Sequence, residues 1–260
     1  MGANPRRAMG PAYTGASPRH VPAMFRRPSL RRLLRWSALA LLAWLGVTWL
    51  LVLVLRFVPP VTSAVMLERH LGAWLRGEHD FHLRQRWVPW SRVSPWVPLA
   101  MVAGEDQKFP YHHGFDFGSI HQAIDAADDG ARLRGASTIS QQTAKNLFLW
   151  NGRSFVRKGL EAYFTVLIEL TWPKRRILEV YMNIAELGDG IYGVGAASDA
   201  YFHEPPAQLD ATQAAQLAAV LPDPRHLHAD RPSAYVQRRT AWIERQMRQL
   251  GGPSYLDGKR

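Results

Sequence analysis

A long uncharged segment near the start constrains this chain more than any other feature. Residues 36–55 contain no Asp, Glu, Lys, Arg or His and consist mostly of Leu, Ala, Val and Trp. About 20 apolar residues in a helix are enough to cross the hydrocarbon core of a bilayer. The alternative is a buried core helix, but such helices seldom lack charges over this length. No obvious cleavage pattern follows, so we expect a retained signal anchor over residues 36–57 rather than a signal peptide.

The positive charge of the chain is concentrated before this segment. The formal net charge is +11, and residues 1–35 contain eight arginines and no acid. The positive-inside rule then places the N-terminus in the cytoplasm and everything after the anchor outside it. We expect residues 1–35 to be a disordered basic tail, and a nucleic-acid function for the whole chain is disfavoured. The chain has no cysteine, which excludes disulfides and thiolate metal sites.

Hydrophobic periodicity after the anchor predicts one mainly α-helical domain. A short amphipathic helix near the bilayer is expected within residues 61–75, and a mainly helical pattern starts near Val97. Further helices are predicted over residues 122–127, 140–148, 160–170, 177–187, 212–221 and 235–250. Asp210 suits an N-cap and Gly188 suits a helix stop. Few segments alternate with period two, so little sheet is expected.

A polar cluster directly follows the apolar residues 97–103. It contains Glu105, Asp106, His112, Gly114 and Asp116. Carboxylates are rarely held beside a core without a partner or a task, which favours a catalytic acid or base. A solvated helix end is the alternative, and this segment alone does not decide between them.

The segment 135–146 is the second stretch whose residues suggest a chemical function. Small and hydroxyl residues open a helix there, and the N–H groups and dipole of a helix start suit an anion. Lys145 lies further along this segment, and Arg153, Arg157 and Lys158 follow soon after, so together they could surround a pyrophosphate. A capped helix with a solvated basic face is the alternative.

Two further patterns allow more than one interpretation. Glu161 lies in an apolar helix with Glu169 two turns later on roughly the same face, but it could simply be the i, i+4 partner of Arg157. The glycines near residues 188–195 resemble a nucleotide loop, but no strand is expected before them and no P-loop Lys-Ser/Thr pair follows. We therefore expect these glycines to allow tight turns and close packing.

Four motifs, taken in order, resemble those of the peptidoglycan glycosyltransferases. They are Glu105-Asp-x-x-Phe109-x-x-His112-x-Gly114-x-Asp116, the segment 135–146, Arg157-Lys158-x-x-Glu161, and Ile177-Leu178-Glu179-x-Tyr181-x-Asn183. The resemblance covers roughly residues 84–250, and the short chain is similar to the monofunctional biosynthetic branch. It lacks the Ser-x-x-Lys and Lys-Thr-Gly motifs of a transpeptidase. Ala136 and Thr143 depart from the usual pattern at positions that carry no charge.

The resemblance implies a lysozyme-like, two-lobed helical domain over residues 84–250. Residues 58–83 would be a membrane-proximal linker, and residues 251–260 a C-terminal tail. It implies an inverting enzyme that polymerises lipid II into β-1,4 glycan strands and releases polyprenyl pyrophosphate. Its expected location is the bacterial inner membrane, with the catalytic domain on the periplasmic side.

The resemblance also assigns expected roles to individual residues. Glu105 matches the general base, and Glu161 matches a second glutamate on the leaving-group side. The expected pyrophosphate and sugar contacts are Lys145, Arg153, Gln141, Gln142, Asn146, Arg157 and Lys158, and the expected supporting residues are Asp106, Phe109, His112, Gly114, Asp116, Ser137, Thr138, Tyr181 and Asn183. No cofactor is obligatory, although the resemblance allows a Mg or Mn ion at Glu161.

The expected partners follow from the same resemblance. They are lipid II, the growing strand on polyprenyl pyrophosphate, the membrane, and proteins of cell-wall synthesis or division, without nucleic acid. Apolar residues 147–150 and Phe155 flank the basic cluster, and either lipid contact or core packing would explain them.

Two other functions stay open at this point. A lysozyme-type glycan-cleaving enzyme would use a glutamate in a cleft, but it needs neither the basic cluster of residues 145–158 nor an anchor. A non-catalytic membrane scaffold would not need Glu105 and Glu161.

Overall fold

The computed structural model describes residue 1 and residues 30–118 and 137–257. The helix predicted over residues 122–127, most of the basic tail, and Ala136 therefore lie outside the described residues. The chain divides into two compact units, Met1–Leu45 and Gly46–Arg260, and each is described by itself.

The helix α1 (Leu30–Leu55) contains the predicted anchor and is long and apolar enough to cross a membrane. Its residues from Gly46 onward belong to the second unit. There the Val52 carbonyl accepts a hydrogen bond from Trp172 Nε1 at 2.8 Å, and the Thr48 hydroxyl lies 2.7 Å from the Tyr163 hydroxyl. The end of α1 is therefore packed into the second unit rather than joined to it by a loose linker.

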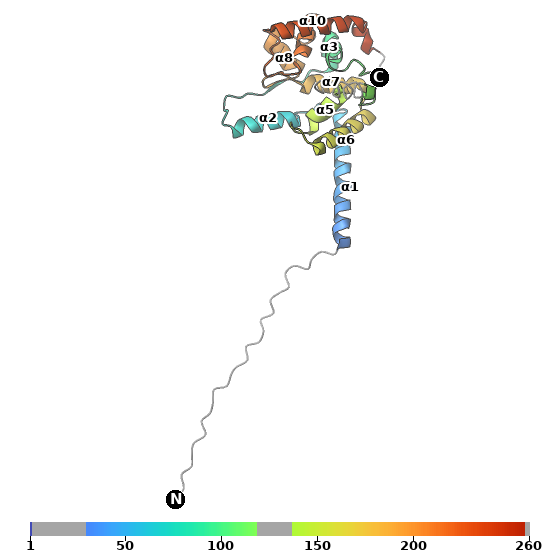
Figure 1. Cartoon of the computed structure of the whole chain (residues 1–260), viewed down its shortest axis with the longest axis vertical. Coiled ribbons are helices and arrows are strands. Elements are labelled where there is room, and N and C mark those ends of the chain that lie inside the picture. The colour runs from blue at the N-terminus through green and yellow to red at the C-terminus, as the bar shows by residue number, and fades with distance from the viewer. Residues whose placement is uncertain (2–29, 119–136, 258–260) are drawn as a thin grey trace, which may run out of the picture. The chain divides into compact units, whose positions relative to one another are not determined.

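The second unit is mainly helical, as predicted. Its helices are α2 (Ala64–Leu75), α3 (Trp96–Glu105), α5 (Ile139–Phe148), α6 (Phe155–Thr171), α7 (Lys174–Ile184), α8 (Gly193–Phe202), α9 (Ala211–Val220) and α10 (Ala234–Gln249), with short 3-10 turns at Trp90–Arg92 and Pro253–Leu256. The helix α3 packs with α9 and α10, while α5 packs with α2 and α6. Figure 1 shows α7 between these two groups of helices.

Caps at the helix starts explain why several predicted helices begin where they do. Asp210 caps α9 by accepting a hydrogen bond from the Gln213 N–H at 2.8 Å, which confirms the expected N-cap. Ser154 caps α6 in the same way through the Arg157 N–H at 3.1 Å. Each cap satisfies a backbone donor that has no partner inside its helix.

A small three-stranded sheet and the helix α8 were not predicted. The strands β1 (Arg84–Gln85), β2 (Glu186–Gly188) and β3 (Ile191–Tyr192) lie in the order β1-β3-β2, with β1 parallel and β2 antiparallel to β3. The prediction that a helix continues to residue 187 was wrong, because Ala185 is extended and the chain enters β2. A strand does reach Gly188, contrary to expectation, but it turns back into β3 and forms no nucleotide loop.

Glycines allow the start of α8 to pack closely, as predicted. Gly193 has a φ of 77°, and a Cβ there would lie 2.5 Å from the Asn183 carbonyl oxygen. A Cβ on Gly195 would lie 2.3 Å from the Arg86 carbonyl oxygen. Beside this contact, Asn183 Oδ1 accepts from the Val88 N–H at 2.7 Å and its Nδ2 donates to the Val88 carbonyl at 2.9 Å. Asn183 therefore joins α7 to the segment before α3.

Gly193→Ala should destabilise the second unit. The added Cβ meets backbone, which cannot move aside easily, and the positive φ disfavours any L side chain. We expect unfolding to become easier by roughly 2–4 kcal/mol, measured by thermal unfolding in detergent micelles. Gly159→Ala in α6 is the control, because its Cβ would meet nothing within 4 Å. Equal melting temperatures for the two variants would contradict this account.

Candidate active site

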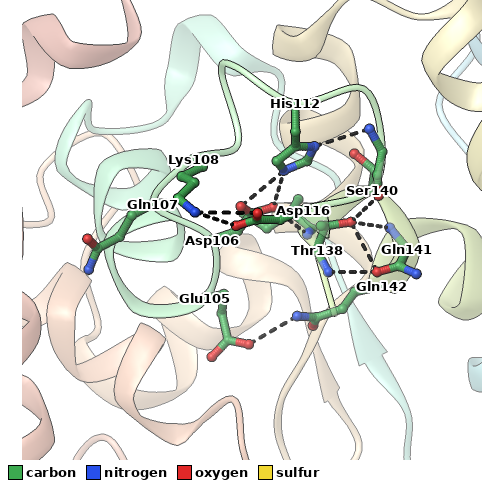
Figure 2. Close-up of polar contacts among 12 residues, drawn as sticks. Glu105, Asp106, Gln107, Lys108, His112, Asp116, Thr138, Ser140, Gln141 and Gln142 are labelled. Carbon is green, nitrogen blue, oxygen red and sulfur yellow. Dashed lines mark hydrogen bonds and ion pairs between the residues drawn. The ribbon is translucent and has the colours of Figure 1, made fainter. Parts of the chain in front are cut away.

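Glu105 lies at the C-terminal end of α3, separated by Gly104 from seven buried residues, 97–103. Its side chain is 17% exposed. Gln142 Nε2 on α5 donates to Glu105 Oε2 at 3.0 Å, and Arg239 on α10 donates to Oε1 at 3.1 Å. Figure 2 shows the Glu105 carboxylate facing the Gln142 amide. The two groups of helices thus each supply one donor to this carboxylate.

The pKa of Glu105 is raised above its ordinary value. Burial is the largest cause, and the negative charge of Asp106 adds to it. The hydrogen bond from Gln142 and the positive charge of Arg239 offset part of the rise. A carboxylate with a raised pKa is a stronger base than an ordinary glutamate.

Tyr181 fixes the orientation of the Gln142 amide. The Tyr181 hydroxyl donates to Gln142 Oε1 at 3.0 Å, so the NH₂ group of Gln142 must face Glu105. Tyr181 is fully buried on α7, and burial raises the pKa of its hydroxyl well above the ordinary value. The hydroxyl therefore remains a donor at physiological pH.

Asp106 joins the acidic segment to the start of α5. Its Oδ2 accepts from the Ile139 backbone N–H at 2.9 Å and lies 2.9 Å from His112 Nε2. His112 Nδ1 accepts from the Gly114 N–H at 3.1 Å, which leaves the ring proton on Nε2 to point at Asp106. Figure 2 shows His112 between these partners. Asp106 and His112 are thus engaged with each other and with backbone.

Thr138 and Gln141 form a capping box at the start of α5. The Gln141 N–H donates to Thr138 Oγ1 at 3.2 Å, and the Thr138 N–H donates to Gln141 Oε1 at 3.0 Å. Thr138 Oγ1 also donates to the Gly114 carbonyl at 2.6 Å. Gly114 has a φ of 90°, and a Cβ there would lie 2.8 Å from Thr165 Cγ2. Gln141 is buried in this cap, and Ser137 beside it is exposed.

The remaining supporting residues of the first motif lie around this segment. Phe109 is buried, and Lys174 Nζ lies 4.6 Å from the centre of its ring. Lys108 Nζ lies 3.1 Å from Asp116 Oδ2. These contacts brace the loop after Glu105 from both sides.

A cavity of about 660 Å³ has Gln142, a partner of Glu105, in its wall, whereas Glu105 itself does not line it. Its wall includes Gln142, Lys145, Asn146 and Tyr181 from the predicted set. It also includes residues from α2, from β2 and β3, and from the turn after α9, among them the cations Arg69, Arg76 and Arg225 and the acids Glu68, Glu186 and Asp223. Gln142 both lines this cavity and contacts Glu105, so it joins the carboxylate to the cavity wall.

Lys145 is the predicted pyrophosphate ligand that lines this cavity. Burial lowers the pKa of its ammonium, and the negative charge of Glu161 opposes that effect. A partly desolvated ammonium binds an anionic ligand more strongly than an exposed one. Arg153 is exposed and does not line the cavity.

Glu161 holds the other two cations of the predicted set. It is buried, and Arg157 donates to its Oε2 at 2.8 Å while Lys158 donates to its Oε1 at 2.5 Å. The i, i+4 pair considered from the sequence is therefore present. Within the described ranges, no group of three or more His, Asp or Glu side chains could hold a metal ion. Both Glu161 oxygens have cationic partners, so this arrangement does not fit a divalent cation at Glu161.

Arg239 is a partner of Glu105 that the sequence motifs missed. It lies on α10, more than a hundred residues after Glu105, and outside all four motifs. A signal was available in the spacing of Arg239, Ile243 and Gln246, which places them on one face of a helix. Nothing local indicates that this face meets Glu105.

Comparison with known proteins decides the family. The family model described as Transglycosylase matches residues 74–248. A biosynthetic peptidoglycan transglycosylase of Xanthomonas oryzae is 56% identical over 229 residues, covering 88% of this chain and 94% of the relative. One of Chromohalobacter salexigens is 56% identical over 231 residues, covering 89% and 98%.

This chain belongs to the transglycosylase family. The resemblance drawn from the four motifs is thereby confirmed, and the chain is a glycosyltransferase rather than a scaffold. The match begins at the end of α2 and extends through most of α10, so it includes Arg239.

Glu105→Gln should make this transglycosylase more stable at neutral pH. The pKa of Glu105 is raised in the folded state, so the protonated form of Glu105 favours folding more than the ionised form does. This stabilisation is present at low pH and is lost as the pH rises through the folded-state pKa. At pH 7 the ionised carboxylate therefore costs stability that an uncharged amide does not.

We expect a higher melting temperature for Glu105→Gln at pH 7 and a smaller difference at about pH 4, where the wild-type carboxyl is largely protonated. Glu244→Gln, whose carboxylate meets Thr212 on the surface, is the control. A Glu105→Gln melting temperature at or below that of the wild type at pH 7 would contradict the assignment.

Proposed function

We propose that this transglycosylase polymerises lipid II into linear β-1,4 glycan strands, with inversion and with release of polyprenyl pyrophosphate. The observation that supports the proposal best is the Glu105 carboxylate, largely buried and held by two donors, one of which, Gln142, also lines the cavity that contains Lys145. The names of the relatives, biosynthetic peptidoglycan transglycosylases, support the substrate class.

Glu105 would act as the general base. Its carboxylate takes the proton from the 4-hydroxyl of the acceptor GlcNAc, and that oxygen attacks the anomeric carbon of the donor sugar. The bond between the anomeric carbon and the pyrophosphate oxygen then breaks with inversion, and the proton stays on Glu105. A positioned base contributes about 10²–10⁴ in rate.

Lys145 would neutralise the departing pyrophosphate. Its place on the cavity wall and its partial burial support this role. Arg153 is exposed, so it would have to move toward the ligand to share the charge. Glu161 would keep Arg157 and Lys158 in place beside the site, which makes it a positioning residue in this scheme. Gln142 and Asn146 are suitably placed on the cavity wall to contact sugars or phosphates.

The location of the enzyme is part of the proposal. A substrate with a polyprenyl tail stays in the bilayer, and α1 can hold the enzyme there. We expect the N-terminus in the cytoplasm and the catalytic unit on the periplasmic side of a bacterial inner membrane. Cell-wall synthesis or division proteins remain a predicted class of partner, and a divalent cation remains a prediction that no step here uses.

Several exposed apolar side chains would add a second membrane contact. Leu147 and Leu149 are buried and Phe148 stacks on Phe164 at 4.4 Å, so these three belong to the core. Trp150 is 47% exposed and Phe155 is 98% exposed. The helix α2 also exposes apolar side chains, namely Leu67, Leu71, Trp74 and Leu75. Burial of such side chains in a lipid surface is favourable and stabilises the bound state.

Glu105→Gln should abolish polymerisation of labelled lipid II. We expect a loss of at least about 10²-fold, because the amide cannot accept the proton. Glu244→Gln on the exposed side of α10 should polymerise like the wild type. Cleavage of preformed glycan without polymer would support the lysozyme-type alternative, and polymer made by Glu105→Gln would overturn the role of Glu105.

Replacing Trp150 and Phe155 with Ser should weaken vesicle binding of a chain that begins at Gly46, which keeps the packed end of α1 but is too short there to cross a membrane. We expect reduced co-sedimentation with anionic vesicles, because two exposed aromatic anchors are lost. The matched control replaces Tyr235 and Trp242, two exposed aromatics of α10, with Ser. Unchanged binding by the Trp150 and Phe155 variant would contradict a membrane contact by these two residues.

A further inference from the structure

One face of α10 is fastened to the segment that carries Glu105. Arg239, Ile243 and Gln246 follow the i, i+4, i+7 spacing of a single helix face. Arg239 contacts Glu105, and Gln246 Oε1 accepts from Gln107 Nε2 at 3.0 Å. Ile243 packs beside Gly104. Contacts to three of the four residues 104–107 therefore come from one helix.

Gly104 lets α10 come this close. A Cβ on Gly104 would lie 3.3 Å from Ile243 Cδ1 and 3.6 Å from the Ala218 Cβ of α9. Any side chain on Gly104 would therefore meet the end of the Ile243 side chain where α10 approaches α3.

Arg239 forms hydrogen bonds with the end of α3. One guanidinium nitrogen donates to Glu105 Oε1 at 3.1 Å and to the Gly104 carbonyl oxygen at 3.4 Å. In the part of the chain that the structure describes, its buried Nε has no hydrogen-bond partner. An unpaired buried donor costs stability, so a purely structural arginine would be poorly suited to this position.

We propose that Arg239 is a positioning residue that, from α10, keeps the Glu105 carboxylate ionised and turned toward the acceptor hydroxyl. This proposal rests on the role of Glu105 as the general base. Arg239 and Gln142 hold one oxygen each, and each oxygen keeps a second lone pair for the acceptor proton. The guanidinium does not take the proton itself, because it remains charged at all working pH values.

Other groups that face Glu105 do not replace the charge of Arg239. Asp106, the next residue, raises the pKa of Glu105, and it is engaged with His112 and the Ile139 N–H. Tyr181 on α7 stays neutral, and Gln142 on α5 is an uncharged donor. Removal of the Arg239 charge should therefore raise the pKa of Glu105 further, and more base would be protonated at a given pH.

The test is the pH profile of kcat/KM for lipid II polymerisation by the full chain in detergent micelles. In Arg239→Gln we expect the acid limb to move up by about one pH unit or more, with activity recovering toward high pH. Arg239→Lys should keep the limb near that of the wild type, because it restores a positive charge. Arg238→Gln, an exposed neighbour on α10, should leave the profile unchanged.

Two results would overturn the proposal. One is an acid limb that stays in place while Arg239→Gln loses the same factor at every pH, which is the effect of a merely structural residue. The other is full activity of Arg239→Gln at all pH values. If Arg239→Gln does not fold, Arg239→Met keeps the aliphatic stem and carries the same expectation.

Glu105→Gln, assayed alongside, separates this inference from the proposed function. If Glu105→Gln polymerises lipid II, the general-base role fails and the Arg239 proposal fails with it. If Glu105→Gln is inactive and the limb of Arg239→Gln does not move, the Arg239 proposal alone fails.

Discussion

The active site depends on holding the Glu105 carboxylate at the end of a helix and next to the core, where both surroundings disfavour its negative charge. Glu105 ends α3, where the helix dipole is negative, and it follows seven buried residues. An ionised carboxylate in such a position needs donors from outside its own helix. They come from Gln142 on α5 and Arg239 on α10, which belong to different groups of helices. The site therefore exists only when the two groups of helices are assembled with each other.

The contacts around this carboxylate also divide the predicted residues by task. Four of the predicted residues form hydrogen bonds with backbone groups and with one another, namely Asp106, His112, Thr138 and Gln141. These bonds fix the acid-bearing loop against α5. Lys145 instead lines the cavity beside Gln142. Glu161 pairs with two cations, Arg157 and Lys158. The motifs thus contain a framework as well as a reacting centre.

Much of the fold could be predicted from the sequence, because most helices carry strong local signals. The apolar periodicity of α9 and α10, together with the Asp210 cap of α9, placed both helices within one residue of their observed bounds, whereas α6 begins at Phe155, before its predicted start at residue 160. The small sheet was missed because strands of two or three residues have no readable alternation and because β1 pairs with a strand about a hundred residues later. The end of α7 was placed too late, since Gly188 is part of that sheet and not the stop of the helix.

The same division between local and long-range signals applies to the site. Glu105, Gln142 and Lys145 stand in motifs, whereas Arg239 becomes visible only when α10 is seen against Gly104 and Glu105. Sequence spacing showed which α10 side chains share a face but not what that face meets.

The most direct measurement is the ionisation of Glu105 itself. It can be followed by 13C NMR of the full chain with carboxyl-labelled glutamate, where Glu105→Gln identifies the resonance. We predict a midpoint above the ordinary glutamate value of about 4.3 in the wild type, and a higher one in both Gln142→Leu and Arg239→Gln. An ordinary midpoint that neither variant moves would contradict the account.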